Sequence, residues 1–196
     1  MKTRTKQHDL YWLAHPPCSG AFHSWLVDNG SLTRRLQARC RKFAVKNVHQ
    51  YWAKPTPDEA KLLALRTGQT ALIREVWLHD GETPLVFARS ILPRGSLRGA
   101  WCGLGKLGYR PLGAALFADA KVSRQPLAFS KLAARHPLRK RAPEAQWARR
   151  SVFVRDGRAI LVTEAFLPAV LVLSKPSTPH PNPLPQGERG IIESSK

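Results

Sequence analysis

The sequence has few of the residues that build disulfide frameworks and metal centres. It contains only three cysteines, Cys18, Cys40 and Cys102, and no CxxC spacing, which argues against both a disulfide framework and a zinc site. Cys18 and Cys40 are one possible disulfide pair, but we expect reduced thiols. None of the patterns GxxxxGK[ST], HExxH and GxSxG occurs. The sequence therefore gives no sign of a P-loop, a zinc protease or a serine-hydrolase nucleophile.

Long apolar runs are also missing. The longest apolar stretch, residues 160–173, is interrupted by Glu164 and Pro168 and is too short to span a bilayer. The N-terminus is basic, but no apolar run follows it, so it does not resemble a secretory signal. We therefore predict a soluble, cytoplasmic protein with no transmembrane segment.

Acidic residues are scarce. Asp and Glu number 13 against 32 Lys and Arg, which gives a formal net charge of +19. Such a charge favours anionic partners: nucleic acid, anionic lipid or a small acidic substrate. Residues 121–150 hold nine Lys or Arg and one acid, Glu144. This basic segment is either an ordinary solvated surface or a surface that steers an anionic substrate toward a site.

The length and composition predict one domain followed by a tail. A chain of 196 residues that is 43% hydrophobic can bury a substantial core, and we place this domain at residues 1–173. Residues 174–196 contain five prolines between positions 176 and 185 and no apolar periodicity. That composition is typical of a disordered or extended tail, to which we assign no function.

Three helix starts can be predicted from local signals. Ser31 is a good N-cap for a helix whose apolar residues recur four apart. The stretch Thr56-Pro57-Asp58-Glu59 combines a capping box with proline at the first helical position, and Gly68 is the predicted end of that helix. Residues 111–118 are predicted to form a third, short helix.

Residues 71–92 are predicted to form a β-hairpin, because Asp80-Gly81 separates two apolar runs rich in β-branched residues. With Asp80 and Gly81 as a two-residue loop, Arg74 is expected opposite Phe87, and Arg89 becomes its diagonal neighbour on the same face. Two guanidinium groups on an apolar face are costly to desolvate unless an anion meets them. A ligand carboxylate is one such anion; pairing with nearby acids, or exposure at a sheet edge, is the alternative.

A second Asp-Gly pair, Asp156-Gly157, predicts another hairpin near the end of the domain. In its register Glu164 lies on an otherwise apolar face. A single carboxylate in that position is as unusual as Arg74. We interpret it as part of a site, with a buried ion pair to Arg74 or Arg150 as the alternative.

Combined, these predictions describe one pocket. Arg74, Arg89 and Glu164 would lie on the strands of an antiparallel sheet. Backbone N–H groups at the helix start near Leu32, or in the stretch Pro111-Leu112-Gly113, can bind a carboxylate without help from side chains. Ordinary core packing is the alternative role for the two leucines. The pattern predicts a small, closed pocket for an acidic molecule.

Several stretches between Trp25 and Pro168 resemble a known family and occur in the order found in that family. They are Trp25-Leu26, Ser31-Leu-Thr-Arg-Arg35, Ile73-Arg-Glu-Val76, Asp80-Gly-Glu82, Ala88-Arg89, Lys106-Leu-Gly108, Pro111-Leu-Gly-x-x-Leu-Phe117, Trp147-x-Arg-Arg-Ser151 and Thr163-Glu-x-Phe-Leu-Pro168. With them the sequence resembles the chorismate pyruvate-lyases, bacterial enzymes that make 4-hydroxybenzoate for ubiquinone.

The resemblance implies a fold and an activity. The fold is α+β, with an antiparallel sheet of about six strands and with helices and flap loops covering one face. The activity is that of a monomeric lyase without cofactor or metal, which removes pyruvate from chorismate and leaves 4-hydroxybenzoate. That reaction is the first committed step of ubiquinone biosynthesis.

The resemblance also implies site residues. The family's carboxylate-binding arginine falls on Arg74, the glutamate that meets the 4-hydroxyl falls on Glu164, and backbone contacts fall on Leu32 and Leu112. Arg89 is assigned to the enolpyruvyl carboxylate from the hairpin register alone. We therefore predict Glu164 and Arg74 as catalytic, and all five residues as substrate-binding. Glu164 either moves a proton or only anchors the hydroxyl, since a proton can also pass directly to the leaving enolpyruvate.

Two other functions stay open at this stage. The ligand-binding domains of a family of bacterial transcription regulators look similar in fold, so a non-enzymatic module that binds a small aromatic acid is one alternative. The sequence shows no convincing helix-turn-helix before the core. Nucleic-acid binding through residues 121–150 is the other alternative, but Phe129 and Trp147 are the only aromatic residues there, too few for stacking platforms. We expect no specific nucleic-acid partner.

Overall fold

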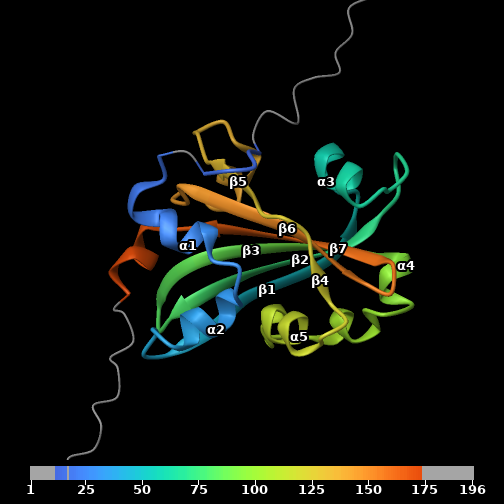
Figure 1. The fold of residues 1–196 in the computed structure, drawn as a ribbon, viewed down its shortest axis with the longest axis horizontal. Coiled ribbons are helices and arrows are strands. Elements are labelled where there is room, and N and C mark those ends of the chain that lie inside the picture. The colour runs from blue at the N-terminus through green and yellow to red at the C-terminus, as the bar shows by residue number, and fades with distance from the viewer. Residues whose placement is uncertain (1–11, 17, 174–196) are drawn as a thin grey trace, which may run out of the picture.

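The computed structural model describes residues 12–16 and 18–173, which form one antiparallel sheet with short helices on both of its faces (Figure 1). The strands are β1 (Phe43–Ala53), β2 (Ala71–Asp80), β3 (Thr83–Pro93), β4 (Ser123–Arg124), β5 (Ala128–Lys131), β6 (Trp147–Arg155) and β7 (Arg158–Phe166). Their order is β1-β2-β3-β7-β6-β4, and β5 also pairs with β6. The predicted α+β class is confirmed. The seventh strand arises because β4 and β5 are both short and pair with different parts of β6.

Short helices connect the strands. The α-helices are α1 (His23–Val27), α2 (Leu32–Gln37), α3 (Pro57–Leu62), α4 (Arg94–Leu97) and α5 (Leu112–Ala118), and the 3-10 helices are η2 (Gly20–Phe22), η3 (Cys102–Lys106), η4 (Pro137–Lys140) and η5 (Pro168–Val172). In Figure 1, α2 and α5 lie side by side against the sheet, and α3 lies on its other side. None of the described helices is long and apolar enough to cross a membrane. The predicted tail, residues 174–196, lies outside the described residues.

The helix starts follow the local signals in the sequence. The Ser31 hydroxyl caps α2 by accepting a hydrogen bond from the Arg34 N–H at 3.3 Å. At α3 the Glu59 carboxylate accepts a hydrogen bond from the Thr56 N–H at 2.9 Å, as a capping box requires. The predicted end of α3 at Gly68 was wrong. The helix stops at Leu62, well before that glycine.

The turn between β2 and β3 differs from the predicted loop. Asp80 is still part of the strand and pairs with Thr83, so that Gly81 and Glu82 form the connection. The start of β1 explains this shift. The Asp80 carboxylate accepts a hydrogen bond from the Lys42 N–H at 2.7 Å, and the Gly81 N–H donates to the Lys42 carbonyl at 2.9 Å. These bonds hold Asp80 in line with the neighbouring strand.

A β-bulge beyond this turn corrects the predicted register. The pairing shifts between Leu78 and His79, so that Arg74 lies opposite Ser90 instead of Phe87. One extra residue on β3 moves every later side chain to the other face. Consequently Arg89 pairs with Glu75 and lies on the face opposite Arg74. The prediction that the two arginines share a face was wrong.

The β6–β7 hairpin forms as predicted. Arg155 pairs with Arg158 around the Asp156-Gly157 loop, and both loop residues have a positive φ, as a type I′ turn requires. The pairing runs without a bulge to the far end of the strands. Glu164 therefore shares its face with Arg74, since Glu164 pairs with Ala88 two residues from the Arg74–Ser90 pair.

The two faces of the sheet have separate cores. We call the face that carries Arg74 and Glu164 the pocket face, and the other the back face. On the pocket face one apolar cluster surrounds Leu26 and another surrounds Leu116. On the back face the clusters include Ile73 and Leu138. A pocket lies between the two clusters of the pocket face.

Candidate active site

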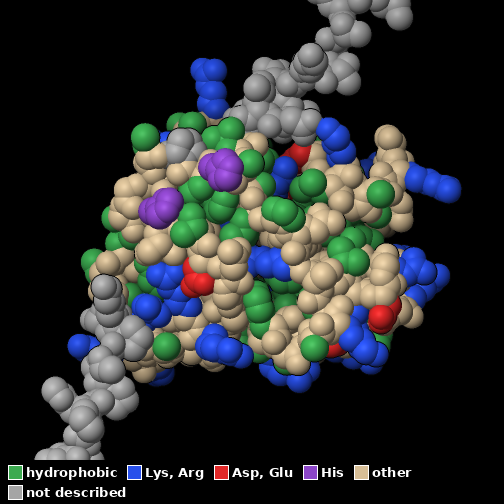
Figure 2. All heavy atoms as spheres, viewed as in Figure 1, with side chains coloured by type: hydrophobic (Ala, Val, Ile, Leu, Met, Phe, Trp, Pro, Cys, Tyr) green, Lys and Arg blue, Asp and Glu red, His purple; other side chains and the backbone are tan. Residues whose placement is uncertain are grey.

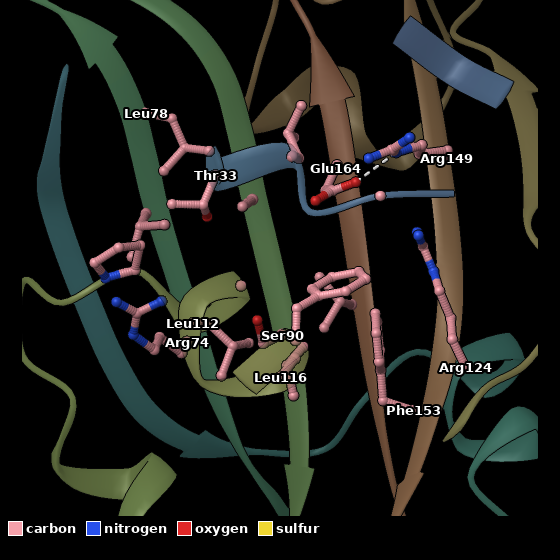
Figure 3. A pocket seen from close by; sticks show the side chains of 18 residues that line it. Thr33, Arg74, Leu78, Ser90, Leu112, Leu116, Arg124, Arg149, Phe153 and Glu164 are labelled. Atoms are coloured by element: carbon pink, nitrogen blue, oxygen red, sulfur yellow. Dashed lines mark hydrogen bonds and ion pairs between the residues drawn. The ribbon is translucent and has the colours of Figure 1, made fainter. Parts of the chain in front are cut away.

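The pocket is enclosed by the sheet on one side and by the starts of α2 and α5 on the other (Figure 3). Its lining residues come from seven segments and are Gly30, Leu32, Thr33, Arg74, Val76, Leu78, Ala88, Ser90, Pro111, Leu112, Gly113, Leu116, Phe117, Arg124, Arg149, Phe153, Val162 and Glu164. The free space is about 40 Å³, room for only a few water molecules. A bulkier ligand therefore requires the lining of the pocket to rearrange.

Arg74 is the buried cation at one end of this pocket. The residue is 2% exposed, and its Nη2 donates hydrogen bonds to the carbonyls of Gly108 and Arg110, each at 3.0 Å. Its Nε has no hydrogen-bond partner, and no carboxylate of the described residues pairs with it. Burial lowers the pKa of the Arg74 guanidinium, although an arginine stays charged under all ordinary conditions. A buried cation in this state is a candidate binding group for an anionic ligand.

Glu164 and Arg149 form an ion pair at the other end. Arg149 Nε donates to the Glu164 carboxylate at 2.6 Å (Figure 3). The partners proposed from the sequence, Arg74 and Arg150, do not pair with Glu164. Arg150 lies on the back face and bonds Asp58 at 2.6 Å. The Glu164 side chain is 16% exposed, so part of its carboxylate still faces the pocket.

Arg149 also fixes the segment that leads into α2. Its side chain is 1% exposed, and Nη1 donates to the carbonyls of Trp25, Leu26 and Asp28 at 2.9, 3.2 and 2.6 Å. One guanidinium thus holds Glu164 and the end of α1 together. Such a network of charge-assisted hydrogen bonds restricts the position of the carboxylate.

The loop between α1 and α2 has its own ion pair. The Asp28 carboxylate accepts hydrogen bonds from Arg35 at 2.9 Å and from the Gly30 N–H at 2.7 Å. Burial raises the pKa of Asp28, but these hydrogen bonds outweigh it and hold that pKa below its ordinary value. The Arg35 guanidinium also lies over the Trp25 ring at 4.0 Å. Together these contacts hold the loop against the pocket.

The helices α2 and α5 begin at the pocket with Leu32 and Leu112. Both residues line it, as predicted. The first N–H groups of a helix have no partner within the helix, so these positions can offer main-chain donors to a ligand. The two helix starts are in very close contact: a Cβ built on Gly113 would lie 2.6 Å from Thr33 Oγ1. Only glycine at position 113 permits this approach.

Replacing Gly113 with alanine is therefore expected to force α2 and α5 apart. We expect a loss of about 1–3 kcal/mol in the free energy of unfolding, as for other overpacked cores, and weaker retention of any ligand held under these helices. Urea unfolding and ligand titration measure the two effects.

Two variants control this prediction. Gly103→Ala places its methyl group in open space and is expected to be neutral. The double variant Gly113→Ala with Thr33→Ala removes the clashing hydroxyl and is expected to recover part of the loss. A Gly113→Ala protein as stable as the parent would show that the helices tolerate separation.

Arg89 belongs to a different cluster, on the back face. Its Nε donates to Glu59 at 2.8 Å and its Nη1 to Glu75 at 2.6 Å. Burial lowers the pKa of Arg89, but these carboxylates more than offset that effect and raise it. Arg141 completes the cluster by bonding Glu75 at 2.8 Å. The sequence-based assignment of Arg89 to a ligand carboxylate rested on the register, and that register is wrong.

Two pocket arginines were missed by the sequence analysis. Arg124 was counted only in the basic segment, and Arg149 also stood in the stretch Trp147-x-Arg-Arg-Ser151 but was given no role in the site; both line the pocket. The signal for Arg149 was present in the sequence. Extending the Asp156-Gly157 hairpin by a few residues places Arg149 opposite Glu164, which is the observed pair. The β4 position of Arg124 has no comparable sequence signal, because that strand has two residues.

Basic side chains outnumber acidic ones on the surface. Figure 2 shows Lys and Arg spread over the visible face, with few Asp and Glu among them. The formal charge of +19 produces a positive field, which raises the encounter rate with anions at low ionic strength. The pocket has the same sign, since its charged residues are Arg74, Arg124, Arg149 and Glu164.

An antiparallel sheet with an enclosed, basic pocket on one face defines an α+β protein built to bind a small acidic molecule. The family model described as "Chorismate lyase" matches residues 11–175. The chain therefore belongs to the chorismate lyase family.

Named relatives agree with this assignment. A "Probable chorismate pyruvate-lyase" of Aromatoleum aromaticum is 48% identical over 182 residues, which cover 87% of this chain and 98% of the relative. A protein of the same name from Azoarcus sp. is 47% identical over 175 residues, which cover 83% of this chain and 93% of the relative.

A solved structure shares the fold alone. The effector domain of PhnF from Mycobacterium smegmatis aligns with a TM-score of 0.50 at 15% identity, and the alignment covers 71% of this chain and 90% of that domain. The likeness shows that this chain and that effector domain share a fold.

Proposed function

We propose that this protein is a chorismate pyruvate-lyase, which splits chorismate into 4-hydroxybenzoate and pyruvate. Membership of the chorismate lyase family supports this proposal, and so do the names of its relatives. The single observation that carries the site assignment is the pocket itself. Arg74, which forms no ion pair with any described residue, lies at one end, and Glu164 lies at the other. The 4-hydroxybenzoate would enter ubiquinone biosynthesis, and we propose that the enzyme acts as a cytoplasmic monomer.

The ends of the pocket match the ends of the substrate ring. Chorismate carries a ring carboxylate and, on the opposite side of the ring, a hydroxyl group. We assign the carboxylate to Arg74, whose buried Nε has no hydrogen-bond partner and whose positive charge strengthens any hydrogen bond to a carboxylate. We assign the hydroxyl to Glu164, which Arg149 holds in place. The first N–H groups near Leu32 and Leu112 supply further donors.

The reaction is an elimination. The proton leaves the ring carbon that bears the hydroxyl, the ether bond to the adjacent carbon breaks, and the ring becomes aromatic. The released enolpyruvate gains a proton on its methylene carbon and becomes pyruvate, so atoms and charges balance. Because aromatisation drives the reaction, the protein mainly has to hold the substrate in a reactive geometry and stabilise charge. Glu164 either moves the proton or anchors the hydroxyl while the proton passes directly to the enolpyruvyl group.

The proposal is tested by mixing the purified protein with chorismate. We expect 4-hydroxybenzoate to appear in the absorbance spectrum and pyruvate to appear in equal amount in a coupled assay. Binding of 4-hydroxybenzoate without turnover of chorismate would instead favour a non-enzymatic module for a small aromatic acid. Absence of both turnover and binding would exclude both functions.

Replacing Glu164 with glutamine is expected to separate its two possible roles. The amide keeps the length of the side chain but cannot accept a proton at neutral pH. A proton-transfer role predicts a fall in kcat of about 100-fold or more. An anchoring role alone predicts about 10-fold, the value of one hydrogen bond to a charged group. Steady-state kinetics with chorismate measure the change.

Glu144→Gln serves as the control for this variant, since it removes the same charge from an exposed position in the basic segment. It is expected to leave kcat unchanged. Full activity of Glu164→Gln would remove Glu164 from the site.

A further inference from the structure

The pocket has one cation more than the ring carboxylate and Glu164 require. Its charged residues are three arginines and one glutamate. Arg149 is neutralised by Glu164 at 2.6 Å. Arg74 and Arg124 remain, and no carboxylate of the described residues forms an ion pair with either of them. An empty pocket with a net charge of +2 matches a ligand that carries two negative charges.

Arg124 is held in place without being neutralised. It comes from the edge strand β4, opposite Phe153, and its guanidinium lies 5.2 Å from the ring of Phe153 and 5.8 Å from that of Phe117. Nη1 donates to the Asn29 carbonyl at 3.2 Å, while the buried Nε has no hydrogen-bond partner. Two aromatic rings and one backbone contact thus orient a guanidinium that still has donors to offer.

The position of Arg124 within the pocket indicates which group of the substrate lies near it. Figure 3 shows Arg124 reaching toward the Glu164–Arg149 pair, across the pocket from Arg74. In chorismate the enolpyruvyl ether is attached to the carbon next to the one that bears the hydroxyl. With the ring carboxylate at Arg74 and the hydroxyl at Glu164, the enolpyruvyl group must lie near the Glu164 end.

We propose that Arg124 binds the enolpyruvyl carboxylate of the substrate, the role that the sequence had suggested for Arg89. This inference rests on the proposed function. It assigns one guanidinium to each substrate carboxylate, with Arg74 for the carboxylate that stays on the ring and Arg124 for the carboxylate that leaves with pyruvate. The arrangement distinguishes substrate from product, because 4-hydroxybenzoate has no enolpyruvyl group for Arg124 to hold.

The substrate and the product therefore test the inference together. Replacing Arg124 with glutamine is expected to lower kcat/KM for chorismate by about 10-fold to 100-fold, since a charge-assisted contact is lost. The inhibition constant of 4-hydroxybenzoate, measured in the same assay, is expected to change by less than about 3-fold. Arg124→Lys, which keeps the charge but not the fork, is expected to give an intermediate kcat/KM and an unchanged inhibition constant.

Lys121→Gln is the matched control, because it removes the same charge from an exposed position three residues away. It is expected to leave both constants unchanged. That result would show that Arg124 acts by contacting the substrate and not through the overall positive charge of the protein. A parallel loss of substrate and product affinity in Arg124→Gln would indicate a structural role and overturn the inference, as would unchanged kinetics. If Arg124→Gln does not fold, Arg124→Lys tests the inference: a lowered kcat/KM for chorismate with an unchanged inhibition constant of 4-hydroxybenzoate would support it, and a parallel change in both would overturn it. A parent protein that does not turn over chorismate would refute the proposed function itself.

Discussion

Replacing Arg74 with glutamine is expected to lower kcat/KM for chorismate by about 100-fold or more. The guanidinium is buried and has no carboxylate partner among the described residues, so its removal deletes the main attraction for the ring carboxylate. Losing one partner of a buried, hydrogen-bonded charge pair costs about 2–5 kcal/mol, and each 1.36 kcal/mol is about tenfold in rate. Steady-state kinetics with chorismate measure the loss.

The affinity for the product should fall in the same variant. Because 4-hydroxybenzoate keeps the ring carboxylate, its inhibition constant is expected to rise with Arg74→Gln, in contrast to the behaviour expected of the Arg124 variant. Arg41→Gln removes a charge from the surface and serves as the control. Retention of full activity by Arg74→Gln would place the substrate carboxylate elsewhere.

Replacing Arg89 with leucine is expected to destabilise the protein by about 3–5 kcal/mol, because a buried ion pair that loses one partner leaves an uncompensated charge. Here two carboxylates, Glu59 and Glu75, lose their shared cation. The free energy of unfolding of a protein of this size is only about 5–15 kcal/mol, so the expected loss is a large part of it. Urea unfolding monitored by tryptophan fluorescence measures the change.

The control for this variant is Arg141→Leu, which removes a second partner of Glu75. The Arg141 side chain is 53% exposed, and the loss of such a pair costs about 0–1 kcal/mol. We expect the folded fraction of Arg89→Leu to keep the KM of the parent, since Arg89 lies on the back face. A stable Arg89→Leu protein with a greatly raised KM would instead return Arg89 to the substrate site.

The two hairpins show how far the sequence could be interpreted. Both contain Asp-Gly between apolar runs, and both were predicted to form two-residue turns. The turn at Asp156-Gly157 does so, and the face of Glu164 follows correctly. At Asp80-Gly81, hydrogen bonds with the Lys42 backbone keep Asp80 in the strand. These bonds come from a segment 38 residues away in the chain, so no local pattern contains them.

The change of turn alone would have kept Arg89 on the same face as Arg74. The bulge after Leu78 moved it to the other face, because it adds a single residue to β3. Pro84 lies at this point and has no N–H to donate to a neighbouring strand, which is why prolines in sheets are found at bulges and edges. This was the one sequence signal for the bulge, and the alternating pattern of apolar residues concealed it.

The resemblance to a family placed more residues around one pocket than periodicity did. Arg74, Glu164, Leu32 and Leu112 all line one pocket, whereas Arg89, assigned from the register alone, does not. Arg124 could not be found from the sequence, because its position depends on a two-residue strand that pairs at the sheet edge. Short edge strands have too few residues for an alternating pattern to be visible.

The charges on the two faces of β2 have a consequence for folding errors. Arg74 and Glu75 are adjacent in the chain and point to opposite faces, and Arg149 and Arg150 do the same on β6. If β2 slipped by one position during folding, Glu75 would enter the cationic chamber and neutralise part of its charge, and the Arg74 guanidinium would join Arg89 and Arg141 behind the sheet. Misaligned chains would thus bring like charges together behind the sheet and would lose the positive charge that attracts an anion, so strand alignment and catalytic competence depend on the same pair of neighbouring residues.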